Sequence, residues 1–172
     1  MQRKDFHIGW SQSVKPPEVF GNEAYVLWDA LLSRYDTIQL SQIYLNAVHD
    51  ADFKLIMKKG LMNILEKQVN ILEQEMDRYH LPLPNRPPKS VRFNLTGNVI
   101  TDEFLFRRLS LGIQISIDKQ TNAIASTFYN DDLRRIFVGF LKKELEVYDD
   151  VCKYGKLKGW LKNPPLTLSS GG

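Results

Sequence analysis

The stretch LPLPNRPPKSVRFNLTGNVI, residues 81–100, decides which fold this sequence can adopt. It contains four prolines and no helical periodicity, so it does not continue a helix. In an extended, polyproline-like form, roughly 20 residues at about 3 Å each reach about 60 Å. A helix of roughly 28 residues is only about 40 Å long. The stretch is therefore long enough to carry the chain from one end of a bundle of long helices to the other.

Amphipathic segments flank this stretch on both sides, because apolar residues recur there at helical spacing. Asp50 or Asp52 is placed to cap the second helix, and Asn130 to cap the fourth. Pro82 stops the second helix, since the residue before a proline avoids helical geometry. The sequence predicts four helices, over about residues 22–48, 52–80, 102–127 and 131–154.

The third segment also carries a strand signal. From Leu109 to Ile117 apolar and polar residues alternate strictly, which is typical of a strand. A helix that is apolar on most sides suits a well-buried bundle member, and helical spacing fits the wider segment. We predict a helix and retain one alternative, a hairpin with Val91, Phe93 and Leu95. The helical face consists of Leu105, Leu109, Ile113, Ser116, Gln120 and Ala123.

Four helices and one long connection predict an all-α fold, a ferritin-like up-down four-helix bundle whose crossover joins helices 2 and 3. At 172 residues the chain can bury one sizeable core as a single domain. We expect Trp160 and Leu161 to pin the end of the chain across the bundle. The predicted parts are an N-terminal arm at residues 1–21, the bundle at 22–157 with its crossover at 81–100, and a C-terminal tail at 158–172.

Composition places the chain among intracellular proteins. Cys152 is the single cysteine, so no intrachain disulfide can form, which favours a reducing compartment. The first 20 residues contain no apolar run typical of a signal peptide. No run of 18 apolar residues predicts a membrane span. The net charge of +3 is too small to indicate nucleic acid by itself.

Glu73, Asp77 and His80, in EQEMDRYH, fall on one face of the second predicted helix. This resembles half of a di-metal site, but the full centre needs a Glu from each of two helices and Glu-x-x-His from each of the other two. The fourth predicted helix has no histidine. His49 lies about 45 Å from His80, at the other end of the second helix, and the C-terminal helix dipole accounts for His80. We predict no metal and no cofactor, and keep Glu73, Asp77 and His80 as the only candidate ligands.

No motif of a known catalytic class occurs. The chain has no Gly-x-Ser-x-Gly, no Gly-x-Gly-x-x-Gly and no Walker loop. Cys152 is expected on an apolar helix face, where it fills space. We expect Glu23, Asp29 and Asp36 to lie away from the apolar stripe of the first helix. The sequence therefore predicts a protein that is not an enzyme.

Basic side chains gather near the starts of the third and fourth helices and around Trp160. Basic charge beside an aromatic ring can hold phosphates and stack bases. Lysines at a helix C-terminus already complement the helix dipole, and helical arginines usually face solvent, so nucleic-acid binding is only a second alternative. The residues concerned are Arg107, Arg108, Arg134, Arg135, Lys153, Lys156, Lys158 and Lys162.

Several segments together resemble a known family. They are EAYVLWDALLSRYD, the Leu-Pro-Leu-Pro start of the crossover, TDEFLFRRLSLGI, NDDLRRIF and KGWLKNPP. The combination resembles an uncharacterised family of ferritin-like bundles from spore-forming bacteria, described as spore coat proteins similar to coat protein F. The resemblance covers about residues 18–166 and implies the four-helix fold with its crossover. It brings no catalytic set with it.

Together these observations predict a non-enzymatic structural or interaction protein, located in the cytoplasm or the spore coat. Its expected partners are other coat proteins or a second copy, docked on an apolar seam. The first alternative is a metal-binding oxidoreductase or metal carrier of the ferritin-like class. The second is weak nucleic-acid binding through the basic residues.

Overall fold

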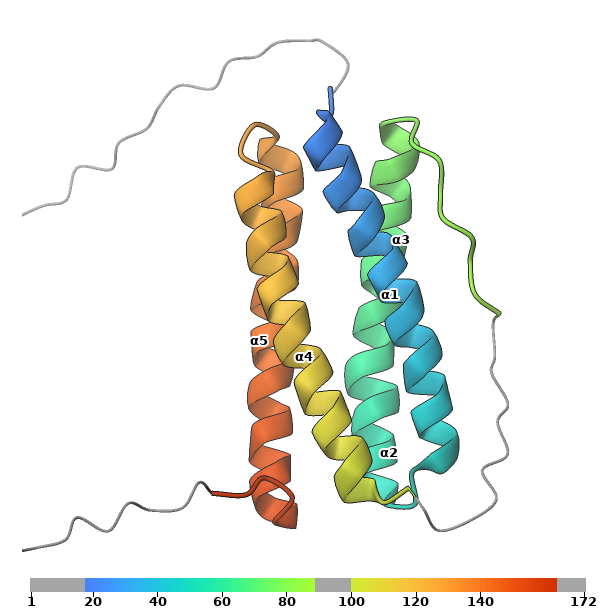
Figure 1. The fold of residues 1–172 in the computed structure, drawn as a ribbon, viewed down its shortest axis with the longest axis vertical. Helices are drawn as coiled ribbons and strands as arrows, with labels where there is room; N and C mark the ends of the chain where they lie inside the picture. Colours follow the sequence, from blue (N-terminus) through green and yellow to red (C-terminus); the bar gives the residue numbers. More distant parts are fainter. Residues whose placement is uncertain (1–17, 89–99, 164–172) are drawn as a thin grey trace, which may run out of the picture.

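The computed structural model describes residues 18–88 and 100–163, and every regular element within those ranges is helical. The second, third and fourth elements follow one another without a break and form a single rod, so the fold has four rods (Figure 1). The predicted all-α four-helix class is confirmed, and the hairpin alternative is wrong because Leu109 to Ile117 is helical. Its proposed partners Val91, Phe93 and Leu95 lie outside the described residues. The elements are α1 Gly21–Ala47, α2 Ala51–Leu55, the π-helix η1 Ile56–Met62, α3 Asn63–Arg78, α4 Asp102–Ser126 and α5 Asp131–Lys158.

The four rods form two antiparallel pairs, α1 with the α2–η1–α3 rod and α4 with α5 (Figure 1). Residues 81–88 leave the end of α3 and run back along the outside of the bundle (Figure 1). α4 begins at the opposite end, where Asp102 accepts hydrogen bonds from the backbone N–H groups of His49 (2.9 Å) and Asp50 (2.8 Å). α3 and α4 are therefore parallel, which requires the long crossover and gives the topology of ferritin-like bundles.

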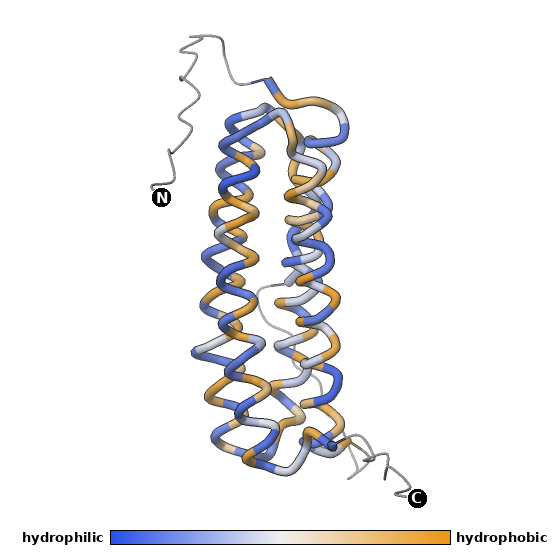
Figure 2. The backbone as a smooth tube through the Cα atoms, turned by 90° about the vertical axis from the view of Figure 1, so that its left-hand side faces the viewer, coloured by the Kyte–Doolittle hydropathy of each residue, from blue (hydrophilic) through white to orange (hydrophobic). Residues whose placement is uncertain are grey.

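The core consists of two apolar halves, stacked along the bundle axis. Hydrophobic and hydrophilic residues alternate along every rod (Figure 2), and the buried hydrophobic ones fall into two clusters. One half lies near the start of α1 and includes Leu27, Leu31, Leu72, Met76, Leu133 and Phe137. The other lies near the end of α1 and includes Phe53, Met57, Leu105, Phe106, Ile113 and Val151.

The π-helix η1 has a simple cause in the spacing of buried residues. Phe53, Met57, Leu61 and Leu65 are buried and stand four residues apart. In a regular α-helix each such step overshoots one turn by about 40°. The wider turn of η1 absorbs this drift, so that all four side chains keep facing the core. η1 was not predicted from the sequence.

An aromatic cluster closes the end of the bundle at which α5 finishes. Trp160 packs against Phe53, Phe106 and Tyr154, with ring centroids 5.6–5.7 Å apart. Trp160 thus packs against the bundle as predicted, whereas Leu161, predicted to do the same, is 37% exposed. α5 continues to Lys158 and ends at Gly159, which has φ 70°, so the predicted end at residue 154 is four residues short. The chain beyond residue 163, and the predicted arm up to residue 17, lie outside the described residues.

Two expectations about inward-facing side chains are wrong. Glu23 was expected outside the stripe, yet it is only 1% exposed and accepts hydrogen bonds from the backbone N–H groups of Phe20 (3.3 Å) and Asn130 (2.9 Å). It therefore joins the start of α1 to the start of α5. The apolar spacing of the predicted fourth helix also places Leu145 on its inner face, yet Leu145 is 48% exposed, because Glu144 takes the inward position.

Asp50 stabilises the same end of the bundle through its charge. Its carboxylate accepts hydrogen bonds from the Phe53 backbone N–H (2.9 Å) and the Tyr154 hydroxyl (2.9 Å), and it pairs with Lys158 at 2.7 Å. The hydrogen bonds from Lys158 and from the Phe53 backbone are the main causes that lower the pKa of Asp50 to about 2. Because the folded-state pKa lies below the ordinary value of 3.8, the ionised group stabilises the fold above about pH 4, and this contribution is lost between pH 4 and pH 2.

We expect Asp50→Asn to lower the urea midpoint at neutral pH while keeping the helix cap, because asparagine also accepts from the Phe53 N–H. The difference between the two proteins should shrink steadily as the pH falls from 4 towards 2. Urea titrations at several pH values measure it. A difference that stays constant with pH would show that the charge of Asp50 is not the stabilising feature.

Candidate functional site

Four buried polar side chains meet between the two apolar halves of the core. Each rod contributes one, and each interrupts the apolar stripe of its own helix. None is more than 8% exposed, whereas such groups are rarely buried without partners. We name this group the central polar cluster; it consists of Arg34 from α1, Gln68 from α3, Gln120 from α4 and Glu144 from α5.

The Arg34 guanidinium organises the cluster. Its Nε donates to Gln68 Oε1 (3.0 Å) and its Nη2 donates to Glu144 Oε1 (2.8 Å). Nε and Nη2 lie on the same edge of the planar group, so the two acceptors sit side by side. Gln120 Nε2 donates to the same Glu144 oxygen at 3.3 Å, and the Phe140 ring lies 5.6 Å from the guanidinium carbon. One cation thus links three of the four rods.

Burial acts on both charges of the pair. It raises the pKa of the Glu144 carboxyl, while the charge of Arg34 and the nearby polar groups of Ser116 and Gln120 act in the opposite direction. It also lowers the pKa of the Arg34 guanidinium, against the attraction of Glu144 and Asp29. The two charges neutralise each other in the ion pair, so neither is free to act as an acid or a base.

Three atoms of the cluster have no hydrogen-bond partner among the described residues. They are one donor, Gln68 Nε2, and two acceptors, Gln120 Oε1 and Glu144 Oε2. A buried polar group without a partner costs about 1–3 kcal/mol. The cluster therefore has hydrogen-bonding capacity that the described part of the protein does not use.

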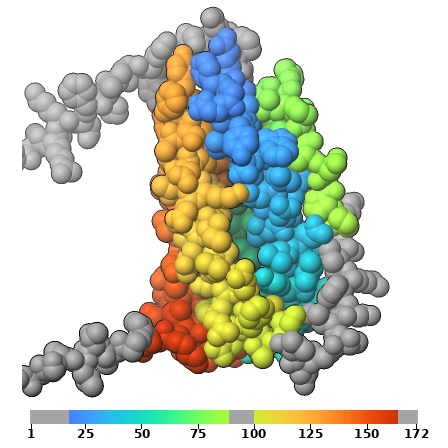
Figure 3. All heavy atoms as spheres, viewed as in Figure 1, coloured from blue at the N-terminus to red at the C-terminus, as the bar shows by residue number. Residues whose placement is uncertain are grey.

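A cavity of about 280 Å³ opens between α1 and α4 and reaches the cluster. Its walls are mainly apolar, and Arg34, Gln68 and Glu144 lie at its inner end. Figure 3 views the molecule from the side on which α1 and α4 meet. A second cavity, of about 330 Å³, lies nearer the start of α1 and is lined by Gln120. Lys119 lines both cavities and bridges the seam, bonding to Asp29 (3.2 Å) and Ser33 (2.8 Å).

The centre of a ferritin-like bundle is where a di-metal site would lie, but these residues do not fit one. Such a site requires four carboxylates and two histidines on the four helices. The central polar cluster offers one carboxylate, two neutral amides and a guanidinium, whose positive charge repels a metal ion. Within residues 18–88 and 100–163, no three His, Cys, Asp or Glu residues are arranged to hold a metal ion.

The candidate ligands Glu73, Asp77 and His80 lie elsewhere, at the end of α3. Glu73 is already paired with Arg86, at 2.8 and 2.5 Å, and also accepts from the Tyr35 hydroxyl. These contacts lower the pKa of Glu73, with Arg86 the largest cause. Asp77 and His80 are exposed. The structure does not bring the three carboxylate and imidazole groups into one site.

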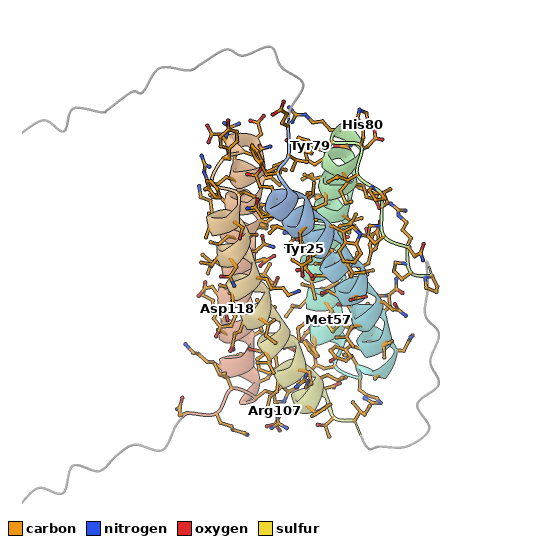
Figure 4. All side chains as sticks on the ribbon, turned by 45° about the horizontal axis from the view of Figure 1, so that its top comes forward. Tyr25, Met57, Tyr79, His80, Arg107 and Asp118 are labelled. Carbon is orange, nitrogen blue, oxygen red and sulfur yellow. The ribbon has the colours of Figure 1, made fainter. Side chains whose placement is uncertain are left out.

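His80 was predicted to lie in the last turn of the helix, and this prediction is wrong. It follows α3 with φ 54°, in the left-handed region, and its backbone N–H donates to the Asp77 carbonyl (3.0 Å). It is the residue that turns the chain out of the helix, a position that glycine or asparagine more often fills. The side chain points away from the bundle at this end (Figure 4).

The basic residues do not gather into one patch. Arg107 and Arg108 lie at the start of α4, and Arg134 and Arg135 at the opposite end, at the start of α5. Most are paired with acidic neighbours, as the following pairs show: Arg107–Glu103, Arg134–Asp131, Arg135–Asp132, Lys153–Asp149, Lys158–Asp50 and Lys162–Glu103. Such pairs contribute little stability but cancel local positive charge.

Arg34, Gln68 and Glu144 were not predicted as a group from the sequence. A signal for them was present, because the buried positions of α1 and α5 follow a 4-3 spacing that includes these polar residues. In α5 the series Leu133, Phe137, Phe140, Glu144, Val147, Val151 and Tyr154 keeps this spacing throughout. A charged residue inside such a stripe, at mid-helix, indicates a buried polar partner on a facing helix.

Comparisons with known proteins add a family and a fold. The profile of a family described as "Protein of unknown function (DUF3231)" matches residues 16–171. The crystal structure of a "putative spore coat protein" from Bacillus halodurans C-125 is similar, with a TM-score of 0.78, 20% identity, and coverage of 86% of this chain and 94% of that one. A conserved hypothetical protein from Mycobacterium tuberculosis gives a TM-score of 0.64 at 10% identity, over 80% of this chain and 99% of that one. A search of curated proteins gives no match.

Proposed function

We propose that this chain, which belongs to the DUF3231 family of proteins of unknown function, is a non-enzymatic interaction protein of the spore coat or of its assembly. The observation that carries the proposal is the Arg34–Glu144 pair at the centre of the bundle. It takes the place where ferritin-like enzymes hold reactive metals. The name of the Bacillus halodurans protein supports the location, since that protein has the same fold.

Surface features support an interaction role. Phe20, Phe128 and Tyr129 gather where α4 turns into α5, and they are 45%, 72% and 67% exposed. The rings of Phe20 and Tyr129 contact each other edge to face, with centroids 4.7 Å apart. Exposed aromatic groups of this kind are more common where proteins contact one another than on ordinary surfaces. No helix in the described ranges is long and apolar enough to cross a membrane.

Spore fractionation tests the proposed location. In the organism that encodes the chain, we expect the tagged protein in the coat extract of purified spores and not in the decoated core. A cytosolic enzyme carrying the same tag is the matched control, which should remain in the core fraction. If the tagged protein is recovered only with that control, the location in the coat is excluded.

Elemental analysis of the same protein, purified without chelators, tests whether it lacks the metal centre of ferritin-like enzymes. We expect iron, manganese and zinc well below one ion per chain, because Arg34 repels cations from the centre. Stoichiometric metal would overturn this part of the proposal and favour the oxidoreductase or metal-carrier alternative.

A further inference from the structure

We infer that the cavity between α1 and α4 is a binding site for a small neutral amphiphile, with an apolar body and a hydroxyl or primary amide group at its inner end. Two unpartnered atoms of the central polar cluster carry this inference. Gln68 Nε2, a donor, and Glu144 Oε2, an acceptor, have no hydrogen-bond partner within the described ranges, and both residues line the cavity. Both atoms are almost fully covered by neighbouring atoms, so a ligand in the cavity would reach them through a small rotation of the Gln68 and Glu144 side chains.

The chemistry of these two atoms selects the end group of the ligand. A hydroxyl or a primary amide both donates and accepts, so it can satisfy Glu144 Oε2 and Gln68 Nε2 at once. A carboxylate can only accept and would meet the negative charge of Glu144. An ammonium can only donate and would leave Gln68 unpartnered beside the Arg34 cation. Because the Arg34–Glu144 pair is already neutral, a charged end group gains no net attraction.

The walls of the cavity select the body of the ligand. Leu40, Leu61, Leu65, Leu109, Ile113 and Val147 supply apolar surface around the polar inner end. A dry cavity of about 150 Å³ can hold benzene, so the about 280 Å³ found here accommodates roughly eleven non-hydrogen atoms. A chain of this size, with one polar end, matches both the volume and the lining.

The backbone around the cavity is built differently from the rest of the bundle. Leu61, which belongs to η1, lines the cavity, and single π turns of this kind occur frequently at functional sites. Gly112 of α4 also lines the cavity, and a Cβ added there would meet no atom within 4 Å. The seam between α1 and α4 is thus open at Gly112, which provides a route from solvent.

Titration of the full-length protein with 1-octanol, followed by NMR, tests the inference. With about nine non-hydrogen atoms, 1-octanol is within the size limit. We expect saturable shifts of the Gln68 side-chain NH₂ resonances. Octanoate and octylamine have the same chain with a charged end, and we expect them to bind at least about tenfold more weakly, the cost of one unsatisfied buried group.

Two glycine variants locate the site. Gly112→Leu places a side chain at the opening of the cavity, and we expect it to weaken octanol binding at least about tenfold without loss of fold. Gly139→Leu is the matched control, because Gly139 is also exposed, also has open space at its Cβ and lies outside the cavity. Thermal melts of both variants confirm that they are folded.

The inference is overturned if 1-octanol gives no saturable shift of the Gln68 NH₂ resonances, because the cavity then holds only water. It is also overturned if octanoate binds as tightly as octanol, or if Gly139→Leu loses binding to the same extent as Gly112→Leu. The measurement uses purified protein, so its outcome does not depend on where the protein lies in the spore.

Discussion

Replacing Arg34 with methionine is expected to lower the free energy of unfolding by about 3–5 kcal/mol, the cost of leaving a buried charge without its partner. Arg34 is 3% exposed and Glu144 8%. Methionine fills similar space but leaves the Glu144 carboxylate without a counter-charge and Gln68 Oε1 without its donor. Urea denaturation of the wild-type and variant proteins measures the loss.

The pH dependence of this loss identifies its cause. Without Arg34, the largest influence that opposes burial is lost, so the folded-state pKa of Glu144 rises further above the ordinary value of 4.5. The penalty is then absent at low pH, where the carboxyl is protonated in both states, and grows as the pH rises above about 4.5. We therefore expect Arg34→Met to be closest to wild type in acid.

A second substitution separates the charge from the packing. Arg34→Met/Glu144→Leu removes the unpaired charge, so it should be more stable than Arg34→Met alone, as in other proteins where buried ion pairs were replaced by apolar residues. Arg107→Met, which breaks an exposed ion pair with Glu103, is the control and should change stability by no more than about 0.5 kcal/mol. A loss below about 1 kcal/mol for Arg34→Met would show that the ion pair is not effectively desolvated.

Gly155→Ala is expected to destabilise the protein by about 1–3 kcal/mol, even though alanine is the better helix former. A Cβ at Gly155 would lie 2.2 Å from Cζ of Phe106 and 2.8 Å from its Cε1. The ring has no free space into which to move, because Phe106 is 1% exposed and packs against Phe53 and Trp160. α5 would have to move away from α4, which disrupts the aromatic cluster.

Gly139→Ala, in the same helix, provides the matched control with the opposite sign. It is exposed, and an added Cβ meets no atom within 4 Å, so the gain in helix propensity of about 0.5–1 kcal/mol should appear in full. The double variant Gly155→Ala/Phe106→Leu should lose less than the sum of its single changes, because leucine is shorter than phenylalanine. Thermal and urea melts compare all of them. A stabilising Gly155→Ala would mean that α4 and α5 do not approach as closely as described.

The path of the chain could be predicted from the sequence because its signals are local. Prolines in residues 81–100 exclude a helix, and the predicted caps Asp50 and Asn130 accept hydrogen bonds from the Phe53 and Leu133 N–H groups (2.9 and 3.0 Å), as the structure confirms. Helical spacing outweighed the alternating pattern around Ile113 because it extends over a whole helix. These features depend only on neighbours in the chain.

The pairing within the central polar cluster could not be predicted with the same rules, because it depends on contacts between helices. Arg34 and Glu144 are 110 residues apart, and although the 4-3 spacing places each on an inward face, no local signal pairs one with the other. Glu23 was misjudged for the same reason, since its partner Asn130 lies on another helix. Conversely, Glu73, Asp77 and His80 share a helical face, but Arg86 from the crossover already engages the first of them. Residues on one helical face can therefore be close in sequence spacing and still not form a metal site.

The wide turn at residues 56–62 also bears on how this family can vary in length. Because that turn takes up the surplus of the four-residue spacing, losing one residue there would convert it to an ordinary helix while Phe53 and Leu65 still face inward. A relative with a one-residue gap at this point would therefore keep the same interior. Such a gap would indicate that the π-helix is replaced by an α-helix. It would change the cavity wall beside Leu61 but leave the fold the same.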